Sequence, residues 1–217
     1  MMMESKKIKK SNGGIRVVAV EGFDGVGKST LARAYCNRHP QVQYVECEPA
    51  VYSVDLYLMT DAKFRASPTG RMLMDIGDMA ADYRKRADEA LLGPILTDRS
   101  IWSAVAGFYA KDPASLKSLL DAVEVLRADH VVLPDRVVVL TGSYETCQAR
   151  LRSRVRCGEF NADLRSAFER RNELYEAMKD GGCDVRFIST DRKSPEDVLS
   201  EFEALSIWDQ QRRDCGQ

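Results

Sequence analysis

The chain has 217 residues, a formal net charge of −1 and 44% hydrophobic residues. This length and apolar content predict one domain with a sizeable core. The near-neutral charge gives no reason to expect binding to a nucleic acid polymer or a membrane surface, and no apolar run reaches the roughly 18 residues of a membrane span. Residues 1–14 are basic but lack the apolar stretch of a secretory signal, so we interpret them as a flexible tail.

The most specific motif lies in residues 16–30. Gly22, Gly27, Lys28 and Ser29 match the G-x-x-x-x-G-K-[ST] pattern of a phosphate-binding loop. The apolar run 17–20 predicts a buried strand before the loop, and residues 29–38 predict a helix after it. Backbone N–H groups then face an anion, the lysine adds a positive charge, and the serine hydroxyl can bind Mg²⁺. The predicted nucleotide-binding residues are Gly22, Asp24, Gly25, Val26, Gly27, Lys28, Ser29 and Thr30.

Strands and helices alternate along the rest of the chain. Short apolar runs predict further strands at 42–45, 95–97, 137–140 and 185–188. Periodic apolar residues predict helices at 71–92, 101–110, 144 onward, 162–178 and 195–207, with Ser143 and Ser194 as N-terminal caps of two of them. The pattern predicts an α/β fold with three layers, in which helices cover both faces of a five-stranded parallel sheet.

Charged residues follow two of the predicted strands. Glu48 comes after the second strand, and Asp98-Arg99 comes after the third. In open α/β sheets, ligands bind at this carboxyl edge. Asp98 can hold Mg²⁺ directly or through water, and Arg99 can reach a phosphate. A solvated turn at Glu48 and a structural Asp98–Arg99 pair are the alternatives.

Four arginines recur at every second position of the segment that begins at Tyr144. On a helix this spacing places Arg150 and Arg154 on one face, and Arg152 and Arg156 on another. Such charge density is typical of a lid that closes over phosphates, which we expect at residues 150–162, and it gives Arg150 and Arg154 catalytic roles. A solvated helix face is the alternative.

The six cysteines are scattered and form no C-x-x-C pair, and the two histidines are far apart in sequence. This distribution argues against a zinc site. Scattered cysteines in a nucleotide-binding chain are typical of a reducing cytoplasm, which we expect as the location.

Over about residues 15–205, the chain resembles the thymidylate kinase family of P-loop kinases. The resemblance is carried by Glu21 to Thr30, with Asp24 inside the loop, by Glu48-Pro49, by Asp98-Arg99 and by the arginine-rich segment. It implies a homodimeric P-loop kinase that uses ATP and Mg²⁺ and transfers the γ-phosphoryl group to a small-molecule acceptor, dTMP. It also implies that Glu48, Arg99 and Asp24 border the acceptor, and that Ser29 and Asp98 hold the metal. The full predicted catalytic set is Lys28, Glu48, Asp98, Arg99, Arg150 and Arg154.

The sequence departs from the family pattern in three places. Cys47 and Met79 stand where the family has arginines, and Gly107-Phe108 replaces a Tyr-Gln pair. If dTMP is the acceptor, we therefore expect Arg99, and secondarily Arg71, to bind its phosphate.

Three other interpretations stay open. The segment from Asp98 to Ser103 also resembles deoxynucleoside kinases, in which Glu48 would act as general base on a nucleoside hydroxyl. A kinase for another small acceptor fits the same residues, as does a nucleotide-binding regulator without turnover.

Overall fold

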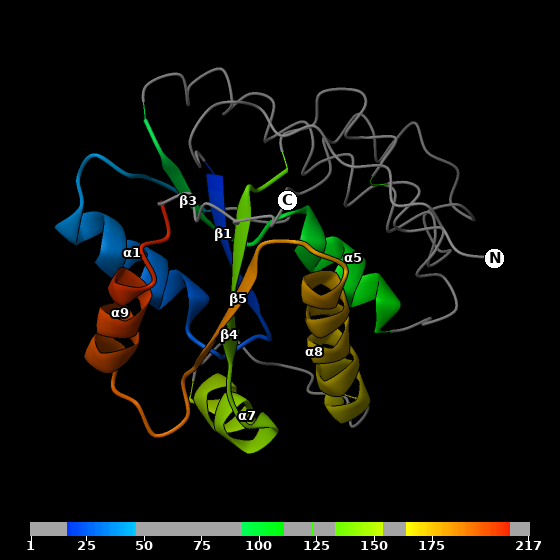
Figure 1. The fold of residues 1–217 in the computed structure, drawn as a ribbon. Helices are drawn as coiled ribbons and strands as arrows, with labels where there is room; N and C mark the ends of the chain where they lie inside the picture. Colours follow the sequence, from blue (N-terminus) through cyan, green and yellow to red (C-terminus); the bar gives the residue numbers. More distant parts are fainter. Residues whose placement is uncertain (1–16, 47–92, 111–122, 124–132, 154–163, 209–217) are drawn as a thin grey trace, which may run out of the picture.

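The structure is a computed structural model that describes residues 17–46, 93–110, 123, 133–153 and 164–208. Its described strands form one parallel sheet in the order β2-β3-β1-β4-β5 (Figure 1). These strands are β1 (Val17–Gly22), β2 (Gln43–Val45), β3 (Ile95–Asp98), β4 (Arg136–Thr141) and β5 (Val185–Ser189). The predicted five-stranded parallel sheet is thus confirmed.

Helices cover both faces of this sheet. Figure 1 shows α1 (Lys28–Arg38) and α9 (Pro195–Ala204) on one face, with α5 (Ile101–Tyr109) and α8 (Leu164–Asp180) on the other. The fifth described helix, α7 (Tyr144–Arg152), follows β4 and lies beyond the end of the sheet. None of the described helices has the length and apolar character that a membrane crossing requires.

The predicted caps are confirmed. The Ser143 side chain accepts a hydrogen bond from the N–H of Thr146, and Ser194 forms a capping box with Asp197. The predicted helix at 71–92 and most of the predicted lid lie outside the described residues.

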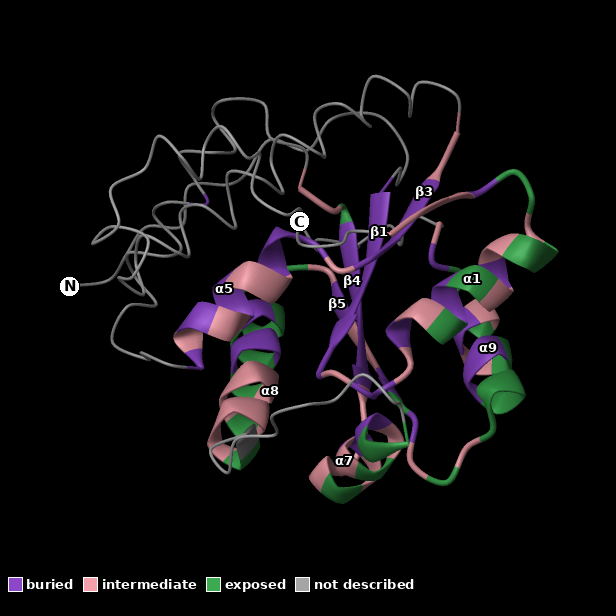
Figure 2. Cartoon of the chain, turned by 180° about the vertical axis from the view of Figure 1, so that it is seen from behind, coloured by how far each residue is buried: buried purple, intermediate pink, exposed green. Residues whose placement is uncertain are grey.

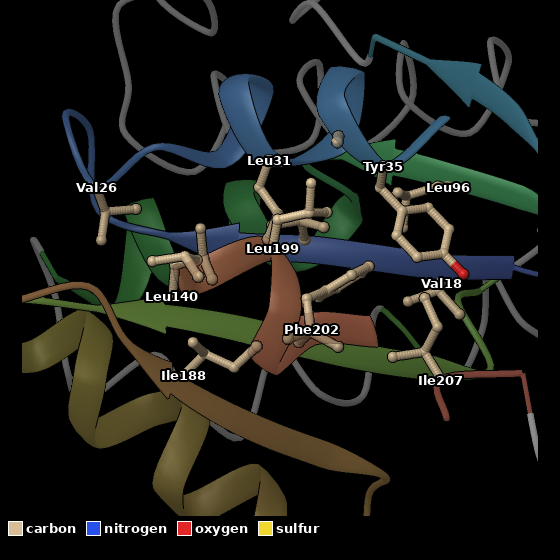
Figure 3. Close-up of a cluster of buried hydrophobic side chains, with 14 of the residues drawn as sticks. Val18, Val26, Leu31, Tyr35, Leu96, Leu140, Ile188, Leu199, Phe202 and Ile207 are labelled. Atoms are coloured by element: carbon tan, nitrogen blue, oxygen red, sulfur yellow. The ribbon is translucent and has the colours of Figure 1, made fainter. Parts of the chain in front are cut away.

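Two apolar clusters hold the layers together. All of β1 is buried (Figure 2), as expected for a central parallel strand with helices on both sides. Val138 and Leu140 point into the cluster under α1 and α9, which Figure 3 shows around Leu199 and Phe202. Alternate residues of the same strand, such as Val139, point into the cluster under α5 and α8.

The buried side chain of Arg136 fixes the end of the described chain by hydrogen bonds. Arg136 is 1% exposed and donates from Nε and Nη2 to Oδ2 of Asp184, at 3.1 and 2.9 Å. Its Nη1 donates to the carbonyl oxygens of Ser206 (3.2 Å) and Ile207 (2.7 Å). The chain turns here with a φ of 46° at Ser206 and places Ile207 in the core. For this reason α9 ends at Ala204, and the prediction that it reaches Ile207 is wrong.

We expect Arg136→Met to lower the free energy of unfolding by about 3 kcal/mol, because it leaves buried acceptors without their donor. Urea unfolding measures this change. The matched control is Arg33→Met, which removes an exposed ion pair to Glu46 and should change the free energy of unfolding much less. Equal losses in the two variants would contradict the anchoring role of Arg136.

Candidate functional site

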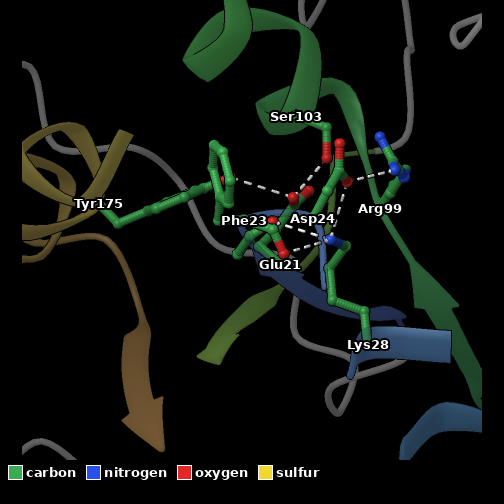
Figure 4. Close-up of polar contacts among 8 residues, drawn as sticks. Glu21, Phe23, Asp24, Lys28, Arg99, Ser103 and Tyr175 are labelled. Carbon is green, nitrogen blue, oxygen red and sulfur yellow. Dashed lines mark hydrogen bonds and ion pairs between the residues drawn. The ribbon is translucent and has the colours of Figure 1, made fainter. Parts of the chain in front are cut away.

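The loop between β1 and α1 closes around its own lysine. Nζ of Lys28 donates to the carbonyl oxygens of Gly22 (2.9 Å) and Phe23 (3.0 Å) and lies 3.5 Å from Oδ1 of Asp24 (Figure 4). The lysine is 7% exposed. Gly27 caps α1 without a side-chain hydrogen bond, so side-chain capping does not occupy the N–H groups of the first turn. These N–H groups and the ammonium together suit an anionic ligand.

Glycines let the loop approach α7 on one side and leave it open on the other. Gly25 has a φ of 85°, and a Cβ there would lie 2.5 Å from the carbonyl oxygen of Cys147. The loop is therefore in close contact with α7. Gly27 has a φ of 109°, and a Cβ there would meet no atom of the described chain within 4 Å. The open side is where a ligand can approach the backbone closely.

The Asp98-Arg99 pair lies next to this loop, as predicted for the carboxyl edge. The register pairs Val20 with Asp98, and the Arg99 N–H donates to the carbonyl oxygen of Val20 at 3.1 Å. Nη2 of Arg99 contacts Oδ1 of Asp24 at 2.7 Å (Figure 4). Arg99 has a φ of 108°, a conformation that costs a non-glycine residue on the order of 1–3 kcal/mol and that is concentrated at functional sites.

Charges around Asp24 keep it ionised. Burial favours its neutral form, but the positive charges of Lys28, Arg99 and Arg171 outweigh this effect and lower the pKa of Asp24. For Lys28, in contrast, the effect of burial on the pKa is larger than that of the neighbouring charges. Burial lowers the pKa of Lys28 to about 8, although the charge of Asp24 acts in the other direction.

Asp98 has a buried oxygen atom without a hydrogen bond among the described residues. The residue is 4% exposed, and its Oδ1 forms no hydrogen bond to any described residue. The hydroxyl of Tyr44 is also buried and without a hydrogen bond there. Burial and the adjacent Asp98 carboxylate raise the pKa of Tyr44, so the two groups lie next to each other. A buried carboxylate oxygen in this state can accept a bond from a ligand or from a water bound to one.

The carboxylate of Glu21 forms a network that the sequence analysis missed. The side chain is fully buried and accepts hydrogen bonds from three hydroxyl groups, two of which, those of Ser103 and Tyr175, are shown in Figure 4. Ser100 donates to Oε1 at 2.6 Å, while Ser103 (2.5 Å) and Tyr175 (3.0 Å) donate to Oε2. Burial and the charge of Glu21 raise the pKa of Tyr175 well above its usual value. A carboxylate inside an apolar strand was the signal in the sequence.

The arginines of α7 differ in their surroundings. Arg150 is half-buried and donates to the carbonyl oxygen of Val26 (3.3 Å) and to Oγ1 and the carbonyl oxygen of Thr190 (both 3.2 Å). Arg152 is exposed and contacts only a side chain of its own helix in the described chain, Gln148. Of the predicted arginine set, Arg150 therefore lies at the loop. Arg154 and Arg156 lie outside the described residues.

Arg171 on α8 also lies at the loop, and the sequence analysis did not predict it. Its guanidinium carbon is 5.5 Å from the centroid of the Phe23 ring, and its Nε is buried without a hydrogen bond among the described residues. Phe23 packs in turn on Phe168, with ring centroids 5.2 Å apart. The loop is thus in contact with α7 near Val26 and with α8 near Phe23.

The described chain brings most of the predicted site together. The loop residues, Asp98, Arg99 and Arg150 converge at the carboxyl edge of the sheet, with Ser29 half-buried and Thr30 exposed in the first turn of α1. Glu48, Cys47, Met79 and Arg71 lie outside the described residues, so the predicted role of Glu48 stays a prediction.

A parallel sheet whose first strand leads through a glycine-rich loop with a buried lysine into a helix defines a P-loop nucleotide-binding protein. Comparisons with known proteins refine this class. A probable thymidylate kinase of Caldivirga maquilingensis is 26% identical over 147 residues, which cover 63% of this chain and 68% of that protein. No family model matches the chain.

Solved structures show the same fold. The thymidylate kinase of Candida albicans superposes with a TM-score of 0.65 at 17% identity, over 88% of this chain and 91% of that one. The thymidylate kinase of Ehrlichia chaffeensis gives a TM-score of 0.59 at 17% identity, over 89% of this chain and 99% of that one. In sequence and in fold, the chain is thymidylate kinase-like.

The buried lysine predicts proton uptake when a phosphate anion binds. At about pH 8.5 part of Lys28 is neutral, and a bound phosphate favours its charged form, so ATP binding takes up a fraction of a proton. At about pH 7 the lysine is already charged and the uptake is small. Calorimetric titration with ATP in buffers of different ionisation enthalpy measures the difference. Lys28→Arg is the control, because a guanidinium stays charged at both pH values. Equal uptake by wild type and control would contradict the prediction.

The unequal positions of the α7 arginines predict unequal effects. Arg150→Ala removes bonds to the loop and to Thr190 and should lower kcat/KM for ATP by about tenfold or more. Arg152→Ala removes an exposed contact and should change kcat/KM less than about threefold. Steady-state kinetics at saturating acceptor measure both values. Similar kinetics in the two variants would show that Arg150 contributes no more to catalysis than an exposed arginine of the same helix.

Proposed function

We propose that the protein is an ATP-dependent phosphotransferase that transfers the γ-phosphoryl group of ATP to dTMP. One observation carries the proposal. Lys28 and Arg99 converge on Asp24 at the phosphate-binding loop of a chain with a thymidylate kinase-like fold. The name of the relative from Caldivirga maquilingensis supports the same activity.

The donor side is formed by the loop and α1. The N–H groups from Gly22 to Thr30 and the ammonium of Lys28 would bind the β- and γ-phosphates. Oxygen ligands suit Mg²⁺, which keeps several waters and takes few protein ligands. Oδ1 of Asp98, which forms no hydrogen bond within the described part of the chain, fits this requirement, and the Ser29 hydroxyl lies in the first turn of α1. Bound there, Mg²⁺ would neutralise charge on the transferred phosphoryl group.

The acceptor side is formed by Asp24 and Arg99. A monophosphate is already an ionised nucleophile, so its phosphorylation requires positioning and charge neutralisation rather than a general base. Arg99 would bind the acceptor phosphate, and its ion pair to Asp24 would orient the guanidinium. Because the pKa of Asp24 is lowered, this carboxylate stays ionised and maintains the pair.

Other parts of the proposal rest on the sequence alone. They are the homodimer, the cytoplasmic location, the lid at 150–162 with Arg154, and the place of Glu48 beside the acceptor.

The acceptor assay tests the proposal. Wild type should phosphorylate dTMP and not thymidine. Arg99→Ala should raise KM for dTMP by roughly 10²-fold, about 2–3 kcal/mol, because it removes a charge-assisted bond to the phosphate. KM for ATP should change little. Arg38→Ala, which removes an exposed ion pair of α1, is the matched control and should leave both constants unchanged.

Other outcomes identify the alternatives. Turnover of thymidine but not dTMP would replace the proposal with a nucleoside kinase, for which Glu48→Gln should abolish turnover and preserve binding. Turnover of neither, with activity on another acceptor, would reject dTMP. ATP binding without turnover across a panel of acceptors would indicate a regulator.

A further inference from the structure

The position of Arg171 gives the site a further cation. Its guanidinium lies over the Phe23 ring and against α5, where a Cβ built on Gly107 would be 3.3 Å from Nη2. It is also close enough to the loop that its charge contributes to the lowered pKa values of Asp24 and Lys28. Arg171 therefore extends the cluster of charges around the loop toward α5 and α8.

Among the described residues, the surroundings of Arg171 provide no acceptor for one of its N–H groups. Its Nε is buried, and no described residue accepts a bond from it. A buried donor without an acceptor costs free energy, and native proteins keep such groups mainly where a ligand, ion or water completes them. The ring of Phe23 covers the guanidinium, which limits its freedom to turn toward bulk water.

The side of the loop on which Arg171 lies indicates its ligand. Residues 23 to 26 form a turn, closed by the hydrogen bond from Val26 N–H to the Phe23 carbonyl oxygen at 3.3 Å. Arg150 contacts the Val26 end, whereas Arg171 contacts the Phe23 end. Asp24, which holds Arg99, lies within the same turn. Arg171 is thus placed on the side opposite Arg150, where the proposed acceptor binds.

We propose that Arg171 binds the phosphate of the acceptor, together with Arg99, and so makes the site selective for a nucleoside monophosphate over the nucleoside. This inference rests on the proposed function for the location of the acceptor. A guanidinium presents pairs of N–H groups that match the oxygens of a phosphate dianion. Arg99 already gives one N–H to Asp24, so a second guanidinium supplies donors that this carboxylate does not occupy.

The experiment compares each acceptor with and without its phosphate. Dissociation constants of the full-length protein for dTMP and thymidine are measured by calorimetry, and their ratio gives the phosphate selectivity. Wild type should favour dTMP by about 10²-fold. Arg171→Gln should reduce this selectivity by about tenfold or more, with the affinities for thymidine and ATP unchanged. The matched control is Arg170→Gln, which changes the neighbouring arginine, bonded to the Ala110 carbonyl oxygen at 2.8 Å, and should keep the selectivity.

A second variant separates phosphate binding from folding. Arg171→Lys keeps the charge but loses the paired N–H groups, so its selectivity should lie between those of wild type and Arg171→Gln. Should Arg171→Gln fail to fold, the lysine variant decides. A loss of selectivity by about threefold or more supports the inference, and wild-type selectivity overturns it.

The outcomes distinguish this inference from the proposed function. Wild type that favours dTMP but does not phosphorylate it refutes the function, while the variants still decide the role of Arg171. Unchanged selectivity in Arg171→Gln, or an equal loss of dTMP and thymidine affinity, overturns the inference alone. A wild type without any preference for dTMP overturns both.

Discussion

The buried carboxylate of Glu21 is the constraint on which the site depends. It lies on β1 immediately before the phosphate-binding loop and is fully buried. Burying a carboxylate without partners is prohibitive, so its oxygens require donors from elements packed on the strand. The donors come from both helices on one face of the sheet, Ser100 and Ser103 at the start of α5 and Tyr175 on α8. The position of β1 is thereby coupled to the positions of both helices.

Helical spacing extends this coupling to the ligand side. On α8, Phe168, Arg171 and Tyr175 are separated by three and four residues and share one face. Because Tyr175 is bonded to Glu21 and Phe168 packs on Phe23, the arginine between them is held at the loop. On α5 the same spacing relates Ser103 to Gly107, which lies against the Arg171 guanidinium. The buried carboxylate of Glu21 thus positions the guanidinium of Arg171 through other residues.

The parts of the structure that local patterns determine could be predicted from the sequence. Apolar runs located the strands, the loop motif located the nucleotide site, and Ser143 and Ser194 marked helix starts. What could not be predicted depends on residues far apart in the chain. The end of α9 is set by the bonds of Arg136 to the turn beyond it. In the sequence, Arg171 cannot be distinguished from other arginines of an amphipathic helix. Only the fold shows that it packs against Phe23.

The carboxylates at the loop leave part of its positive charge available to a phosphate ligand. The three hydroxyl groups disperse the charge of Glu21, and Asp24 is shared by Lys28 and Arg99. Neither carboxylate therefore neutralises all the positive charge around it. Because burial already disfavours the ammonium of Lys28 and lowers its pKa to about 8, an anion that approaches this lysine relieves an existing electrostatic cost. A cation that has been desolvated during folding interacts more strongly with an anionic ligand than an exposed cation does. The burial that makes Lys28 costly to the fold is thus the property that makes it effective toward a phosphate.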